Sequence, residues 1–291
     1  MRILILGGDG MLGHQLLQHL GGRYETRVTL RQGLTAYARY DIFHAGNSYT
    51  GIDVRSTDRL IEVLSDFYPQ AVINAVGIVK QRATAKESVP SLEINALLPH
   101  RLAVLCRMIG ARLVHMSTDC VFAGAKGGYT EDDIPDAIDL YGRSKYMGEI
   151  CDEGCVTLRT SIVGLELARK AGLIEWYLAQ HGVISGFDRA IYTGFTTAEM
   201  ARIIERVLTR HFNLSGIWHV ASAPISKYAL LAGLTRRLGR TGLTIERDTQ
   251  FVCDRSLNAT RFNQLTGYVP PTWEAMLDEL AQQVRNARTA T

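Results

Sequence analysis

Apolar and polar positions follow two different periods along the first half of the chain. Continuous apolar runs at Arg2–Leu6, Ala71–Asn74 and Arg112–Met116 predict strands that are buried on both faces. Between the runs, apolar residues recur at helical spacing, as in Met11–Leu20, which stops at two glycines. Strands that alternate with helices of this length are typical of a doubly wound parallel sheet with right-handed connections. The pattern therefore predicts an α/β fold.

The remaining elements of the first half have weaker signals. Arg27–Leu30 predicts a second strand and Gly51–Val54 a third, and the polar, aromatic stretch Arg31–Thr50 between them predicts an irregular surface loop. A long helix is expected over Leu92–Ile109, with Ser91 as its cap. These expectations place every helix of the first half between two strands.

The second half is less regular, with short strands such as Val183–Ser185 between helical segments. It contains no internal repeat, low-complexity tract or proline-rich linker. We expect a first domain over residues 1–160, to which residues 183–221 return. Residues 161–291 are expected to form mainly a smaller, mostly helical α/β domain.

Composition and charge exclude several classes of protein. The 291 residues are 46% hydrophobic and 21% charged, with a net charge of +3, which is too small to indicate nucleic-acid binding. No apolar run approaches the roughly 18–20 residues that span a bilayer, and the short N-terminal run predicts a strand rather than a signal peptide. Five cysteines without a C-x-x-C pair, and histidines without metal-ligand spacing, favour a reducing compartment and no metal site. We expect a soluble cytoplasmic protein that does not insert into membranes.

The first strand runs directly into a glycine-rich turn that opens the first helix. In this turn Gly7 permits a tight bend, Gly10 lets a pyrophosphate approach the backbone, and Gly13 allows close packing of helix and strand. Met11 and Leu12 supply amides at the start of the helix, where the helix dipole favours a phosphate. A Rossmann-like dinucleotide site is therefore expected here.

The end of the second strand bears on the choice of cofactor. An acid there would bind the ribose of NAD, whereas Arg31 suits the 2′-phosphate of NADP. The sequence therefore favours NADPH, with NADH as the alternative. Asp53 and Val54 end the expected third strand, where the carboxylate of Asp53 could bind the adenine amino group or simply precede the next helix.

A tyrosine and a lysine four residues apart indicate acid–base chemistry. On a helix, Tyr141 and Lys145 lie on one face, one turn apart. An ammonium group near a phenol stabilises the phenolate and lowers the pKa of the tyrosine towards the range of a general acid. The pair follows the glycine loop and the fifth strand in the chain, and this order gives an otherwise weak motif its value.

With these motifs, the sequence resembles the extended short-chain dehydrogenase/reductase superfamily. Within it, the chain is similar to the dTDP-4-dehydrorhamnose reductase family of nucleotide-sugar 4-keto-reductases. The resemblance spans nearly the whole chain and rests on Gly7–Gly13, Asp53-Val54, Asn74–Gly77, Ser117–Phe122, Tyr141–Lys145 with Gly148-Glu149, Leu158–Ser161, Tyr192–Thr197 and Tyr268–Trp273.

The resemblance implies a role for individual residues and a reaction. Tyr141 is the proton donor, Lys145 its electrostatic partner and a ribose ligand, and Thr118 binds the substrate carbonyl oxygen, with Asp119 beside it at the substrate. The cofactor site includes Ala75, Val76 and Gly77. Residues 1–160 would then bind NAD(P), and residues 161–291 would mainly bind a nucleotide-sugar substrate whose C4 carbonyl is reduced. The resemblance also allows a homodimer.

Some residues leave the assignment open. Asn95 matches a helix asparagine that supports a proton-relay water in the superfamily, but it could equally be a surface residue, and Lys80-Gln81-Arg82 could meet a diphosphate or form a solvated face. The family usually has an aromatic residue at the position of Cys120 and often a tryptophan at that of Ile162, so dTDP-rhamnose chemistry itself is in question. An epimerase, a dehydratase or a non-catalytic relative similar to the regulatory subunit of methionine adenosyltransferase are the alternatives.

Overall fold

The computed structural model describes residues 1–79, 87–168 and 170–289, so Lys80-Gln81-Arg82 lie outside the described residues. The chain folds into two compact units. The first unit holds Met1–Thr118, Ile138–Leu158 and Met200–Ile217, and the second holds Asp119–Ala137, Arg159–Glu199 and Trp218–Thr291. Each unit is described by itself below.

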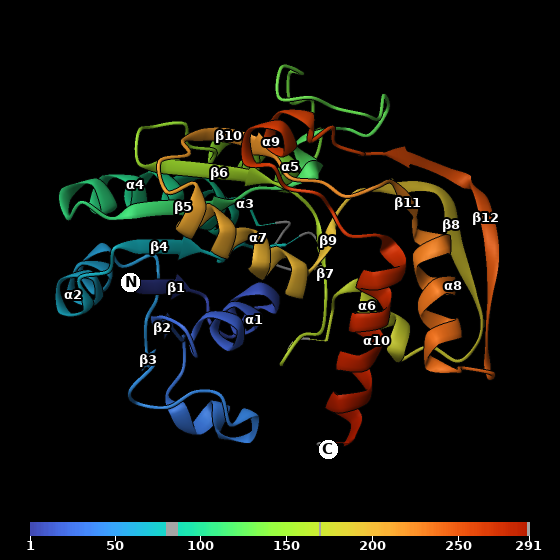
Figure 1. Ribbon diagram of the computed structural model, residues 1–291, viewed down its shortest axis with the longest axis horizontal. Helices are drawn as coiled ribbons and strands as arrows, with labels where there is room; N and C mark the ends of the chain where they lie inside the picture. The colour runs from blue at the N-terminus through green and yellow to red at the C-terminus, as the bar shows by residue number, and fades with distance from the viewer. Residues whose placement is uncertain (80–86, 169, 290–291) are drawn as a thin grey trace. The chain divides into compact units, whose positions relative to one another are not determined.

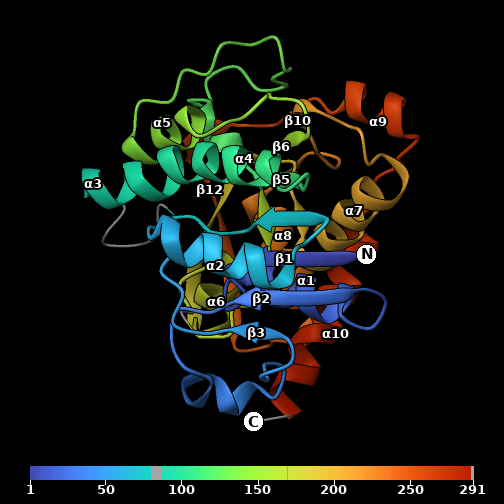
Figure 2. The ribbon, with the colours of Figure 1, turned by 90° about the vertical axis from the view of Figure 1, so that its left-hand side faces the viewer.

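The main sheet has seven strands within the described residues, in the order β10-β6-β5-β4-β1-β2-β3. The pairs from β3 to β6 are all parallel, and Figure 2 shows β1, β2 and β3 side by side. The order reverses between β1 and β4, the place where open α/β sheets bind ligands. The predicted doubly wound α/β fold is confirmed. The strands are β1 (Arg2–Leu6), β2 (Glu25–Thr29), β3 (Ser48–Tyr49), β4 (Ala71–Asn74), β5 (Arg112–Met116), β6 (Cys155–Arg159) and β10 (Gly216–His219).

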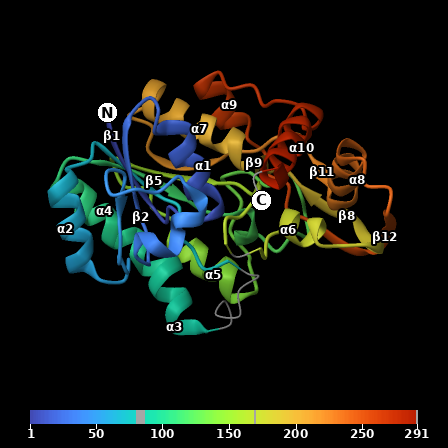
Figure 3. The ribbon, with the colours of Figure 1, turned by 90° about the horizontal axis from the view of Figure 1, so that it is seen from below.

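Helices cover both faces of this sheet. Figure 3 shows α1 (Met11–Leu20) and α7 (Thr197–Arg210) on one side, with α2 (Thr57–Phe67), α4 (Leu98–Met108) and α5 (Leu140–Met147) on the other. His19 of α1 and Glu205 of α7 form an ion pair at 2.8 Å, which agrees with their common face. The connections therefore wind in both directions from the first strand.

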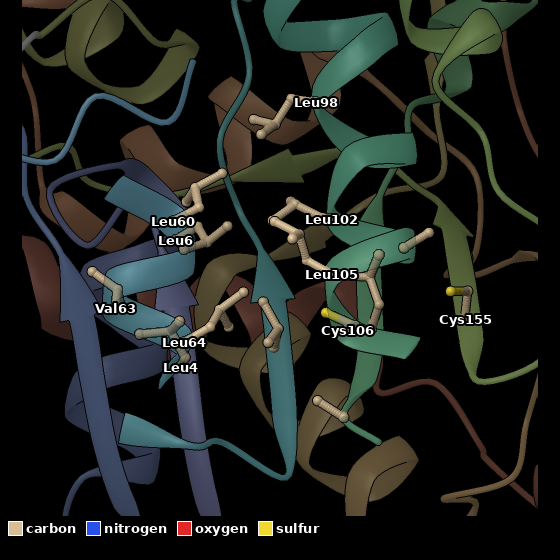
Figure 4. Packing of buried hydrophobic residues seen from close by; sticks show 14 of the residues in the cluster. Leu4, Leu6, Leu60, Val63, Leu64, Leu98, Leu102, Leu105, Cys106 and Cys155 are labelled. Carbon is tan, nitrogen blue, oxygen red and sulfur yellow. The ribbon is translucent and has the colours of Figure 1, made fainter. Parts of the chain in front are cut away.

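The core of the first unit lies between the sheet and helices α2 and α4. Leu4 and Leu6 of β1 contact a cluster that includes Leu60 and Leu64 of α2 and Leu102 of α4, as Figure 4 shows. All five side chains are buried, and each buried leucine contributes roughly 1.5–3 kcal/mol relative to an exposed one. This core fixes the strand ends that carry the chemistry described below.

The third strand differs from the prediction. Gly51–Val54 is not a strand; β3 is Ser48–Tyr49, because Val28 of β2 pairs with Ser48. Gly51–Val54 follows β3 outside the ladder. The expected irregular loop also contains a 3₁₀ helix, η1 (Leu34–Tyr40).

The predicted cap at Ser91 is wrong as well. Helical structure already begins with α3 (Ser88–Ser91), continues through a π-helical turn, η3 (Leu92–Leu97), and passes into α4. Ser91 is therefore buried inside a continuous helical segment. A π turn widens the helix by one residue and occurs frequently at functional sites.

The described residues of the second unit form two small sheets. Figure 1 shows β8 (Gly182–Tyr192) beside β12 (Leu243–Asp254), with which it pairs in parallel, and β11 (Ile225–Ser226) pairs with β8 in the antiparallel direction. The predicted strand Val183–Ser185 is part of β8 and lies outside the main sheet. The other elements are η4 (Asp119–Val121), β7 (Ile162–Val163), α6 (Leu173–Leu178), β9 (Phe195–Thr196), α8 (Lys227–Leu238), α9 (Thr260–Thr266) and α10 (Trp273–Thr289).

The segment that returns to the first unit is Met200–Ile217, which is shorter than the expected 183–221. It consists of most of α7 and the start of β10. Across the described ranges, no helix combines the length and the apolar character needed to cross a bilayer.

Candidate cofactor and catalytic site

The glycine loop leaves β1 as a sharp turn against the neighbouring strands. Gly7 has a φ of +84°, a conformation that favours glycine, and its amide donates to Thr29 Oγ1 at 3.1 Å. The amide of Gly8 donates to the Thr29 carbonyl at 3.0 Å. These bonds hold the turn to the end of β2.

Helix α1 begins very close to this turn. A Cβ on Gly13 would lie 2.0 Å from the carbonyl oxygen of Gly7, so only glycine fits there. Gly10 is the N-cap and supplies no side-chain hydrogen bond, and the first turn has no acidic residue. Amides at the N-terminus of a helix favour an anion. The loop, with Met11 and Leu12 in the first turn, therefore fits the diphosphate of a dinucleotide cofactor.

The exit of β4 adjoins the same loop. The amide of Ala75 donates to the Leu6 carbonyl at 3.2 Å, and a Cβ on Gly7 would lie 2.9 Å from Cγ2 of Val76. Gly77 follows and is half-buried. The structure thus brings the predicted cofactor residues of the β1 and β4 exits together.

Arg31 and Asp53 lie near each other, and the carboxylate of Asp53 binds another side chain of the protein. The amide of Ile52 donates to the Leu30 carbonyl at 3.0 Å, which places the half-buried Asp53-Val54 beside the exposed Arg31. The carboxylate of Asp53 binds the guanidinium of Arg55 at 2.5 Å. This hydrogen bond is the main reason that the pKa of Asp53 is lowered, and Arg31 adds a smaller effect in the same direction.

Helix α5 carries the tyrosine and the lysine. Asp139 caps it by accepting from the amide of Gly142 at 2.8 Å, which fixes where the helix starts. Tyr141 is half-buried and Lys145 is 4% exposed, one helical turn further on. Lys145 Nζ donates to the Met116 carbonyl at the end of β5, at 2.6 Å.

Burial sets the acid–base properties of this region. It lowers the pKa of Lys145 to about 8, and the carboxylate of Glu149 acts in the opposite direction. Burial, and then Lys145, hold the pKa of His115 on β5 well below its usual value. His115 Nδ1 faces the side-chain nitrogen of Asn74 at 3.1 Å. Because Asn74 Oδ1 accepts from the Val76 amide, the nitrogen of Asn74 donates to a neutral imidazole.

Asn95 is fully buried in the π turn, so the surface alternative is wrong. Its Oδ1 accepts from the Ile78 amide at 2.9 Å, and its Nδ2 donates to the Ile78 carbonyl at 3.0 Å and to Ser144 Oγ at 3.1 Å. Ser144 in turn donates to the Tyr141 carbonyl at 3.0 Å. The asparagine therefore connects the β4 exit loop to the helix of Tyr141 and Lys145.

Ser144 and His115 have no role in the sequence-based prediction. The signal available for His115 was a polar residue inside a strand that is otherwise apolar. For Ser144 it was only its position between Tyr141 and Lys145.

Thr118 and Asp119 lie just beyond β5. Thr118 is buried and is the last residue of its segment of the first unit. It lies two positions after Met116, whose carbonyl accepts from Lys145. Asp119 begins η4 in the second unit, is buried, and donates its amide to the Thr160 carbonyl at 3.2 Å. Cys120 is half-buried in η4, and Ile162 is half-buried in β7, where it pairs with Phe195.

This set of groups is suited to proton transfer beside a dinucleotide. It offers a phenol, a buried amine whose pKa is lowered to about 8, and a hydroxyl just beyond the end of the adjoining strand. Among the described residues, no cluster of three or more histidine, cysteine or acidic side chains could hold a metal ion.

Comparison with known sequences gives one family and several relatives. The model of the family described as RmlD substrate binding domain matches residues 1–286. A dTDP-4-keto-6-deoxy-D-glucose reductase from Streptomyces niveus is 31% identical over 81% of this chain and 78% of its own length. Methionine adenosyltransferase 2 subunit beta from Xenopus laevis is 33% identical, but only over 56% of this chain and 47% of its own length.

Solved structures show the same fold. The dTDP-4-dehydrorhamnose reductase from Bacillus anthracis, solved in complex with NADP, superimposes with a TM-score of 0.76. The match covers 97% of this chain and 99% of that one, at 21% identity. At that identity the likeness establishes the fold.

Proposed function

Because the chain belongs to the family described as RmlD substrate binding domain, we propose that it reduces the 4-keto group of a nucleotide-linked 6-deoxysugar with NADPH. The predicted family and the predicted class, an NAD(P)H-dependent oxidoreductase, are confirmed. The observation that carries the proposed reaction is the contact of Lys145 Nζ with the Met116 carbonyl. Lys145 lies one helical turn after Tyr141, and Met116 lies two residues before Thr118.

The first unit supplies the proposed cofactor site. The glycine loop would hold the diphosphate, Arg31 would bind the 2′-phosphate, and Ala75, Val76 and Gly77 would complete the dinucleotide site. When bound, the cofactor supplies the hydride. Residues 161–291, the second domain expected from the sequence, would mainly bind the substrate in this proposal.

The residues of the chain manage the proton. The hydroxyl of Tyr141 donates its proton to the oxygen of the developing alkoxide, while Thr118 donates a hydrogen bond to the same oxygen. The ammonium of Lys145 stabilises the tyrosine phenolate that results and binds the ribose hydroxyls. Burial of Lys145 strengthens its effect on the phenolate, because charges interact more strongly away from water.

The alternatives differ in what they require at these positions. Removal of water by a 4,6-dehydratase needs a second carboxylate after Asp119, where this chain has Cys120. A non-catalytic relative similar to the methionine adenosyltransferase subunit needs no Tyr141 hydroxyl at all, and the 33% identity over half of the chain makes it the second candidate.

The decisive experiment measures NADPH oxidation with dTDP- and UDP-linked 4-keto-6-deoxysugars. Tyr141→Phe should lower kcat about 10³-fold, since general acid catalysis contributes 10²–10⁴-fold, and NADPH should still bind. Tyr146→Phe is the matched control, because Tyr146 lies on the same helix and is exposed. Failure of the wild-type chain to turn over any keto-sugar nucleotide, with altered kinetics of a partner enzyme, would establish the non-catalytic alternative.

The cofactor preference has its own test. Loss of a charge-assisted hydrogen bond costs about 1.5–3 kcal/mol, so Arg31→Ala should reduce the preference for NADPH over NADH roughly 10–100-fold. Arg39→Ala, an exposed arginine of η1, is the control. An unchanged ratio of kcat/KM values would remove Arg31 from the cofactor site.

A further inference from the structure

Two consecutive residues at the end of β5 bind side chains on and just after helix α5. The Met116 carbonyl accepts from Lys145 Nζ at 2.6 Å, and Ser117 Oγ donates to Glu149 Oε1, also at 2.6 Å. Thr118 follows, with its proposed contact to the substrate oxygen. We propose that Glu149 is a positioning residue for Lys145: its carboxylate, held by Ser117, supplies the counter-charge that keeps the buried ammonium in place. This inference rests on the proposed function.

The chain brings Glu149 to this place by an abrupt end of the helix. Helix α5 stops at Met147, and Gly148 follows in a non-helical conformation. A Cβ on Gly148 would lie 1.9 Å from the carbonyl oxygen of Asn95, so the chain can pass the π turn only with glycine at this position. Glu149 is therefore directed back towards β5 instead of continuing the helix away from it.

The surroundings of Lys145 make this carboxylate important. From β5, His115 is near enough for Lys145 to lower its pKa, but it is buried and neutral, with its pKa well below the usual value. From η3 comes the uncharged Asn95, and from α4 the exposed His100, whose Nε2 lies 2.8 Å from the Met147 carbonyl. Tyr141 lies on the lysine's own helix. Burial lowers the pKa of Lys145 to about 8, and Glu149 is the group that opposes this change.

Removal of the carboxylate should therefore lower the pKa of Lys145 further. A fall of one unit in the pKa of Lys145 reduces the ammonium form tenfold at any pH well above the pKa, which corresponds to about 1.4 kcal/mol. Glu149→Gln keeps an acceptor for Ser117 Oγ and removes only the charge. Ser117→Ala keeps the charge and removes one hydrogen bond to the carboxylate, so it should act in the same direction but less strongly.

The test follows Lys145 directly by NMR of the full-length chain with ¹³Cε-labelled lysine. The sequence has six lysines, few enough to separate their signals, and Lys145→Met identifies the signal of interest. We expect the titration midpoint of Lys145 to fall in Glu149→Gln and, by less, in Ser117→Ala. Glu153→Gln is the matched control, since Glu153 is an exposed acid four residues further on. An unchanged midpoint in a folded Glu149→Gln chain would overturn the proposal.

Activity gives a second readout that a purely structural role would not produce. In Glu149→Gln the alkaline limb of the kcat profile should move to lower pH, so that kcat falls about tenfold more at pH 8.5 than at pH 6.5. A uniform loss at all pH values would contradict the proposal and indicate a structural role. If no keto-sugar is reduced by the wild type, the proposed function fails, and the NMR midpoint still decides the role of Glu149.

Discussion

A buried cation lies beside a buried histidine in both units of the molecule. In the first unit Lys145 faces His115, and in the second Arg159 Nη1 lies 3.2 Å from His219 Nε2. Burial and the neighbouring cation lower the pKa of both histidines, to about 4 for His219. The same physical causes therefore keep both imidazoles neutral.

The two cations differ in how they are held. Lys145 has its bond to a carbonyl and the carboxylate of Glu149 nearby, and its own pKa falls to about 8. Arg159 lies over the ring of Phe122, 5.3 Å from its centroid, and Phe122 is stacked on Tyr129 at 4.1 Å. A guanidinium stays charged in proteins, whereas an amine can titrate. The titratable amine suits the chemical role proposed for Lys145, and the contacts of Arg159 suit a role in the fold.

Replacement of Lys145 tests this contrast with the largest expected effect. Lys145→Met should lower kcat about 10³-fold, because Tyr141 loses the charge that stabilises its phenolate and general acid catalysis contributes 10²–10⁴-fold. The free energy of unfolding at pH 7 should rise by about 2 kcal/mol. The lowered pKa of Lys145 destabilises the wild type by roughly 3 kcal/mol, which the variant avoids, and loss of the hydrogen bond to Met116 destabilises the variant by about 1 kcal/mol. Kinetics and urea unfolding measure the two effects.

The gain in stability expected of Lys145→Met should depend on pH in one direction. A folded-state pKa of about 8 against 10.5 in the unfolded chain means that the unfolded state binds more protons between these values. The wild type therefore becomes more stable as pH rises through this window, and the advantage of Lys145→Met should shrink there. A destabilised Lys145→Met chain at pH 7 would remove the contrast with Arg159.

Replacement of Arg159 should lower stability and leave kcat almost unchanged, the reverse of the result expected for Lys145. Arg159→Met removes the donor to His219 Nε2 and the contact with the Phe122 ring, and leaves a buried acceptor unpaired. Such losses cost about 3 kcal/mol together. We expect a lower unfolding midpoint in urea, with kcat per folded molecule within about threefold of wild type. A large loss of kcat at full folding would assign Arg159 to the chemistry.

The acid side of the stability curve depends on His219. Its pKa of about 4 in the folded state lies below the 6.5 of the unfolded chain, so its contribution is present above about pH 6.5 and is lost as pH falls towards 4. At pH 5 the loss amounts to about 2 kcal/mol. His219→Gln should therefore lose less stability than wild type between pH 7 and pH 5. Equal losses in both chains would place the acid sensitivity elsewhere, with His115 as the next group to replace.

Sequence pattern was sufficient where an element is defined by its own residues. The bounds of β1, β4, β5 and α1 were predicted correctly, because a continuous apolar run or a helical stripe ends at a glycine or a turn. The strand β3 was misplaced because its two residues become a strand only through pairing with β2. Local periodicity does not contain that information.

The same limit applies to the site. Tyr141 and Lys145 were found because both lie in one short motif, and the glycine loop because it follows a clear strand. Asn95 was left between two interpretations, since its partners are the backbone of Ile78, 17 residues earlier, and Ser144, 49 residues later. The role proposed for Glu149 depends on the turn at Gly148, which only the approach of the π turn makes obligatory.

The smallest expected effects concern Tyr129, whose hydroxyl and ring make different contacts. Its hydroxyl accepts from the amides of Gly124 at 3.2 Å and Lys126 at 3.1 Å, while its ring stacks on Phe122. Tyr129→Phe keeps the stacked ring and removes the acceptor, so it should lower the free energy of unfolding by about 1 kcal/mol. Tyr129→Leu removes the stacking as well and should cost about 1 kcal/mol more. If Tyr129→Phe costs as much as Tyr129→Leu in urea unfolding, the hydroxyl and not the aromatic stack accounts for the contribution of Tyr129 to stability.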